Sequence, residues 1–141
     1  MKSDTTIKNI CVAAAKRHTI KPIDFPFTTL FDGEHSGDLS NQITFSESEL
    51  PISQTFIAKS NWTLVTTRRI VSCINGQVRE TAASNVNSWN WGNFKGYKGE
   101  HTSIGEIKLD SGDVINIHIE AGRASMIIIY SIMTLVGQLK K

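Results

Sequence analysis

The sequence predicts an α+β fold in which about seven antiparallel strands lie between an N-terminal and a C-terminal helix. Residues 104–109 and 114–119 alternate between apolar and polar positions on either side of an Asp-Ser-Gly-Asp turn, as two paired strands do. After residue 120 the apolar residues follow three-and-four spacing, which indicates a helix. Upstream, short runs with strand character recur at close spacing, which is typical of an antiparallel meander.

Composition favours one soluble domain that spans residues 1–141. The net charge of +2 argues against a nucleic-acid coat, which requires a strongly basic face. Cys11 and Cys73 lie in apolar surroundings without metal-ligand spacing, which favours buried, reduced thiols over a disulfide. The start of the chain lacks the features of a secretory signal, so we expect a cytoplasmic protein. The most apolar run, Met126 to Val136, is too short to cross a bilayer.

A helix is predicted within residues 1–19, and an irregular acidic segment follows it over residues 20–53. Asp4 or Thr5 can cap the helix, and basic residues suit its C-terminal end. Prolines and glycines interrupt the acidic segment. Six of the thirteen carboxylates of the chain fall in it and are opposed only by Lys21: Asp24, Asp32, Glu34, Asp38, Glu47 and Glu49.

Residues 54–119 are predicted to form antiparallel strands. The expected strands are residues 54–59, 62–67, 69–74, 77–82 and 86–91, followed by the hairpin of residues 104–119. Asn75-Gly76 is the strongest turn signal, because both positions of a two-residue hairpin turn must accept positive φ. The C-terminal helix, residues 120–139, is expected to bury Ile128, Ile132, Leu135 and Leu139.

The order of these elements resembles the bacterial PH-like superfamily. The phrase Trp-Thr-Leu-Val-Thr-Thr-Arg-Arg-Ile at residues 62–70 is similar to a strand segment of that family, and Val86-Asn87-Ser88-Trp89 lies where the family places its later strands. The resemblance covers about residues 42–139. It implies a bent antiparallel sheet, or partly open barrel, plugged at one end by the C-terminal helix, and the N-terminal helix is an addition to that pattern.

Catalytic motifs such as GxSxG, HExxH, a phosphate loop or paired metal-binding cysteines do not occur in the sequence. The four histidines are scattered without ligand spacing. We therefore expect a non-enzymatic protein without metal or cofactor. The enzymatic alternative is a small hydrolase or nuclease that uses His101 or His118.

The acidic segment points to a protein partner. Its carboxylates would repel nucleic acid and steer a basic protein to the surface, although a solvated loop explains the same composition. A small domain of this profile resembles immunity proteins, which block a cognate toxin, often a basic nuclease, with acidic side chains. The sequence therefore predicts an interaction module, most specifically an immunity-type inhibitor. Its expected contact residues are Asp32, Glu34, Asp38, Glu47 and Glu49, with Trp89 and Trp91 as aromatic anchors unless these rings fill the core.

A second hypothesis places function on basic residues. It requires Lys59, Arg68, Arg69 and Arg79 to converge near strand ends, where a PH-like adaptor would hold the phosphate of a lipid head group. The alternative for these four is a solvated face.

Overall fold

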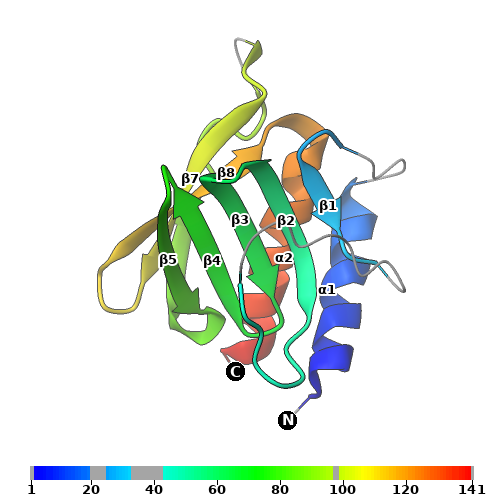
Figure 1. Ribbon diagram of the computed structural model, residues 1–141. Coiled ribbons are helices and arrows are strands. Elements are labelled where there is room, and N and C mark those ends of the chain that lie inside the picture. Colours follow the sequence, from blue (N-terminus) through cyan, green and yellow to red (C-terminus); the bar gives the residue numbers. More distant parts are fainter. Residues whose placement is uncertain (1, 20–24, 33–42, 97–98, 141) are drawn as a thin grey trace.

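The computed structural model describes residues 2–19, 25–32, 43–96 and 99–140 (Figure 1). Helix α1 (Asp4–Thr19) is preceded by Ser3, whose Oγ accepts a hydrogen bond from the N–H of Thr6 at 3.2 Å. Ser3 therefore caps the helix, rather than Asp4 or Thr5. The Asp4 carboxylate instead accepts hydrogen bonds from the side chains of Thr67 and Arg68.

The first sheet contains five antiparallel strands in chain order. They are β1 (Thr28–Leu30), β2 (Pro51–Ala58), β3 (Asn61–Thr66), β4 (Arg69–Ile74) and β5 (Gln77–Ala82). Asn75 and Gly76 join the last two strands with φ values of 50° and 83°, as predicted for a two-residue hairpin turn. Strand β1 was not expected, and it adds to the sheet from within the acidic segment.

The second sheet contains three antiparallel strands, β6 (Val86–Asn90), β7 (Thr102–Leu109) and β8 (Val114–Glu120). A short 3-10 helix, η1 (Ala83–Asn85), separates β5 from β6, so the meander divides into two sheets. The α+β class is confirmed, but the described strands form two separate sheets and do not close into a barrel.

Helix α2 (Ser125–Leu139) lies behind the five-stranded sheet and beside α1, and both chain ends lie at the same end of the molecule (Figure 1). Ile128, Ile132 and Leu135 are completely buried, as predicted, and Leu139 is partly buried against the same core. The rings of His18 and Tyr130 stack 3.6 Å apart and join the two helices. By length and composition Gly122–Leu139 would suffice to cross a membrane, and half of this stretch is buried inside the fold.

A second apolar cluster covers the opposite face of the five-stranded sheet. Phe31 is completely buried there with Trp62, Leu64, Val71 and Cys73, and Ile43 and Phe45 pack against them. Phe31, Ile43 and Phe45 all come from the segment that was predicted to be irregular. The described parts of this segment therefore cover one face of the sheet, in addition to carrying acidic side chains. Both cysteines are buried and free, as predicted.

Two hydroxyl groups join the sheets. The Oγ1 of Thr63 on β3 donates to the carbonyl of His118 at 2.9 Å and accepts from the His118 N–H at 2.8 Å. The Oγ of Ser72 on β4 donates to the carbonyl of Asn116. These side chains therefore satisfy backbone groups at the edge of β8 that no neighbouring strand pairs.

Candidate functional site

The three-stranded sheet has one buried and one exposed face. Ile107, Ile115, Ile117 and Ile119 point into the core, as the alternation of the sequence predicts. The exposed face, called the outer face here, carries eight side chains of β6, β7 and β8: Ser88, Asn90, Ile104, Glu106, Lys108, Val114, Asn116 and His118. Two of the three exposed large apolar side chains among the described residues lie on it, namely Ile104 with 44% and Val114 with 37% of its surface exposed.

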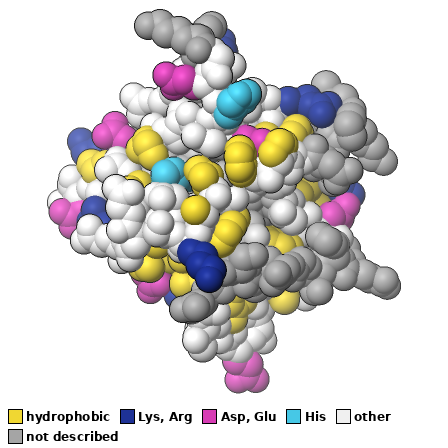
Figure 2. All heavy atoms as spheres, turned by 45° about the horizontal axis from the view of Figure 1, so that its top comes forward, with side chains coloured by type: hydrophobic (Ala, Val, Ile, Leu, Met, Phe, Trp, Pro, Cys, Tyr) yellow, Lys and Arg dark blue, Asp and Glu magenta, His cyan; other side chains and the backbone are white. Residues whose placement is uncertain are grey.

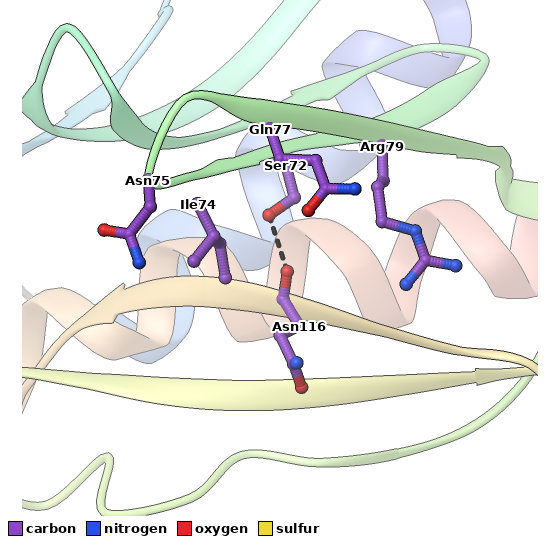
Figure 3. A pocket seen from close by; sticks show the side chains of 6 residues that line it. All are labelled: Ser72, Ile74, Asn75, Gln77, Arg79 and Asn116. Carbon is purple, nitrogen blue, oxygen red and sulfur yellow. Dashed lines mark hydrogen bonds between the residues drawn. The ribbon is translucent and has the colours of Figure 1, made fainter.

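A hollow of about 250 Å³ lies beside the outer face, where β4 and β5 overhang β8 (Figure 3). Ile74, Gln77 and Arg79 reach from β4 and β5 toward β8, while Asn116 borders the hollow from β8. The Arg79 Nη1 donates to the Val114 carbonyl at 2.8 Å. Asn116 lies both in the wall of the hollow and on the outer face, and the Val114 backbone accepts the Arg79 hydrogen bond, so the hollow borders the outer face along β8.

The four basic residues of the head-group hypothesis do not converge. Lys59 lies in the turn before β3 and Arg68 in the turn after it, so the length of a six-residue strand, about 20 Å, separates their positions in the sheet. The Arg68 guanidinium pairs with Asp4 at 3.0 Å, and Arg69 pairs with Glu49 at 2.9 Å and with Glu80 at 2.7 Å. Arg79 is the member of this set that lines the hollow between the sheets.

The acidic residues predicted as contacts lie in different environments. Asp32 pairs with Lys16 of α1, and Glu47 is exposed at the surface. Glu49 is only 5% exposed, so it is a structural charge rather than a surface charge. Glu34 and Asp38 lie outside the described residues. Figure 2 shows described charges of both signs interspersed on one face of the molecule, without a large acidic patch among them.

Glu49 anchors the turn between β3 and β4. Its carboxylate accepts hydrogen bonds from the Arg69 guanidinium, the Thr66 hydroxyl and the N–H of Ser46. Burial by itself would raise the pKa of Glu49, but these hydrogen bonds outweigh burial and hold the pKa below its usual value. The carboxylate is therefore ionised at neutral pH and bound within the fold.

Trp89 and Trp91 stack on each other with ring centroids 5.6 Å apart. Both rings are partly buried and pack against the main core, because Trp89 pairs with the inward-facing Ile107 across β6 and β7. They therefore contribute to the core, and the outer face begins at their neighbours Ser88 and Asn90.

A larger hollow of about 430 Å³ runs along α1 between Lys8, Lys16 and Asp32. Burial lowers the pKa of Lys8, and the nearby Asp32 carboxylate acts in the opposite direction. Lys16 and Asp32 pair with each other, which leaves Lys8 without an ion pair among the described residues, so this hollow has one excess cation, as the hollow at Arg79 does.

Two of the histidines, His18 and His118, make structural contacts. The His118 ring is 3.0 Å from the Oδ1 of Asn61, and the His18 ring stacks on Tyr130. Burial raises the pKa of the Cys11 thiol to about 12, so little thiolate exists at neutral pH. In the described residues, no three His, Cys, Asp or Glu side chains gather where they could hold a metal ion.

His118 should make stability fall in mild acid. Burial lowers the pKa of its ring below the usual 6.5, so below pH 6.5 the unfolded chain takes up a proton that the folded ring resists. We expect the urea midpoint of the wild type to decline between pH 7 and pH 5. The His118→Gln variant should show a shallower decline over the same range. Parallel curves for the two proteins would mean that this ring does not titrate differently on folding.

The sequence identified Arg79 as one of four candidate basic residues. It could not predict the hollow around Arg79, because the hollow forms between two sheets. Other residues that line the hollow, such as Ile74 and Gln77, could not be recognised as site residues in the sequence, because amides and single apolar residues next to a turn are common.

No family model, curated protein or solved structure matches this chain.

Proposed function

We propose that the protein is a non-catalytic protein-interaction module of PH-like architecture that acts in the cytoplasm. The arrangement of a five-stranded sheet, a three-stranded sheet and a C-terminal core helix supports the PH-like assignment. An immunity-type inhibitor, which binds a cognate toxin and covers its active site, is the most specific form of this proposal.

The observation that carries the proposal is the exposed outer face. Both faces of the five-stranded sheet are largely covered, one by α2 and the other by Phe31, Ile43 and Phe45, and Val78 on β5 is its one exposed large apolar side chain among the described residues. On the three-stranded sheet, Ile104 and Val114 instead remain exposed among charged and amide side chains. Larger exposed apolar patches rimmed by polar residues mark protein interfaces, and Ile104 and Val114 would supply the apolar contacts of such a surface.

The structure changes which surface we assign to the partner. Asp32 and Glu49 have cationic partners within the fold, so they contribute little net charge for steering a basic toxin. The outer face has charges of both signs and two exposed apolar side chains. We therefore place the partner on the outer face rather than on the acidic segment.

A phosphate or lipid head-group adaptor is the second candidate function, since Arg79 lines a hollow without an ion-pair partner among the described residues. Arg68 and Arg69 form ion pairs within the fold, so the hollow has fewer available cations than a polyphosphate head group requires. Co-sedimentation with anionic vesicles separates the two functions, because the interaction module should stay in the supernatant.

Replacing Ile104 should remove partner binding without unfolding the protein. Its side chain is 44% exposed on the outer face, so Ile104→Glu places a charge where the partner should pack. We expect tagged Ile104→Glu to recover at least tenfold less of the partner from native lysate than the wild type, by quantitative mass spectrometry.

Val78→Glu is the matched control. Val78 is 52% exposed but pairs with Cys73, on the face of β5 that points away from β8. The Val78→Glu variant should recover the same proteins from native lysate as the wild type. If Ile104→Glu and Val78→Glu both recover the wild-type set, the outer face is not the interface and the proposal fails.

A further inference from the structure

We propose that the hollow at Arg79 receives the carboxylate of an aspartate or glutamate side chain from the protein partner. This inference rests on the proposed function, because the hollow borders the outer face at Asn116, which belongs to both. It identifies the partner by its chemistry, as a protein that presents an acidic side chain beside an apolar contact.

The charge of Arg79 is not compensated within the described fold. Lys16, Arg68, Arg69 and Lys140 each form an ion pair with a carboxylate. Among the described residues, Arg79 has no carboxylate within ion-pair distance, and its one hydrogen bond goes to a backbone carbonyl. A guanidinium beside a hollow therefore attracts an external anion.

The hydrogen-bonding capacity of Arg79 also remains largely unused. A guanidinium has five N–H donors, and the bond to the Val114 carbonyl uses one of them. The remaining donors form a planar fork that matches the two oxygens of a carboxylate. Gln77 lies beside Arg79 on the same wall of the hollow and can donate a further hydrogen bond through its amide (Figure 3).

The size and polarity of the hollow select a side chain rather than a large ligand. Its volume of about 250 Å³ is below the roughly 300 to 1,000 Å³ of pockets for drug-sized molecules. Ile74 provides an apolar wall for methylene groups. One cation among neutral side chains balances the single negative charge of a carboxylate, whereas a phosphate dianion would be left with an uncompensated charge.

The Arg79 site is tested by titration of the full chain with two matched probes, N-acetyl-glutamate amide and N-acetyl-glutamine amide. The probes differ in the carboxylate alone. We expect the glutamate probe to shift the NMR signals of the Arg79 Nε–H and the Gln77 side-chain amide in a saturable way at millimolar concentration. The glutamine probe should leave them unchanged. Arg79→Gln should abolish the response, and Arg79→Lys, which keeps the charge but loses the fork, should weaken it.

A separate titration with inorganic phosphate tests whether the hollow binds phosphate rather than a carboxylate. If phosphate saturates the same signals at a lower concentration than the glutamate probe, the hollow is a phosphate site and the inference is overturned. Equal responses to the glutamate and glutamine probes would also overturn it, because the carboxylate would then not be recognised.

Capture from native lysate separates this inference from the proposed function. Arg79→Gln should recover roughly tenfold less partner than the wild type while its melting temperature stays unchanged, because Arg79 is exposed. If Arg79→Gln recovers the partner like the wild type while Ile104→Glu does not, the carboxylate inference falls and the interaction module stands. If neither variant changes recovery, the proposed function itself falls.

Discussion

Ile132→Asp should unfold the protein at room temperature. The Ile132 side chain is completely buried in α2, so aspartate would place an unpaired carboxylate in the main core. The cost of about 5 kcal/mol is comparable to the whole stability of a small domain. We expect circular dichroism to show no cooperative melting transition for this variant.

Gly137→Asp is the control for this substitution, since it introduces the same side chain into the same helix. Gly137 is exposed, and a Cβ atom at this position would meet no atom within 4 Å. This variant should melt close to the wild type. A wild-type melting curve for Ile132→Asp would mean that α2 does not close the core as the structure shows.

Arg69→Met should destabilise the fold by about 3 kcal/mol, the lower end of the cost of breaking a buried ion pair. The Glu49 side chain is 1% exposed and that of Arg69 is 20% exposed, so removing the guanidinium leaves a buried carboxylate without its cation. Urea unfolding at pH 7 measures the loss. Adding Glu49→Gln should restore part of the stability, because the amide is neutral, its oxygen can still accept from the Ser46 N–H, and its NH2 group can donate to the Thr66 hydroxyl.

Arg68→Met is a closely matched control, because it changes the adjacent arginine. Arg68 pairs with Asp4, but 46% of its side chain is exposed, and exposed ion pairs contribute about 1 kcal/mol or less. Equal losses for the two variants would contradict the assignment of Glu49 and Arg69 as a buried pair.

Elements with a local periodic signal were predicted well from the sequence. Helix α1, the β7–β8 hairpin and helix α2 follow the expected apolar spacing, and Asn75-Gly76 forms the expected turn. These features depend on residues close together in the chain, so the sequence contains the information directly.

Features that depend on contacts between distant segments were not predicted. Strand β1 has three residues, too few to show a period, and it is recognised only through its pairing with β2. The division of the meander at η1 reflects the packing of two sheets rather than a strong turn signal. Charge counting also gave no indication that Glu49 is buried or that Arg68 and Arg69 have partners within the fold.

The hydroxyl groups of Thr63 and Ser72 have a consequence for how the protein avoids self-association. An uncovered strand edge can recruit the strand of another molecule and begin aggregation. Here the edge of β8 is occupied by side chains of the first sheet, which bind its backbone groups without adding a strand. Thr63→Val keeps nearly the same shape and removes the two hydrogen bonds at His118, whereas Ser72 and Arg79 still bind the carbonyls of Asn116 and Val114 on the same edge.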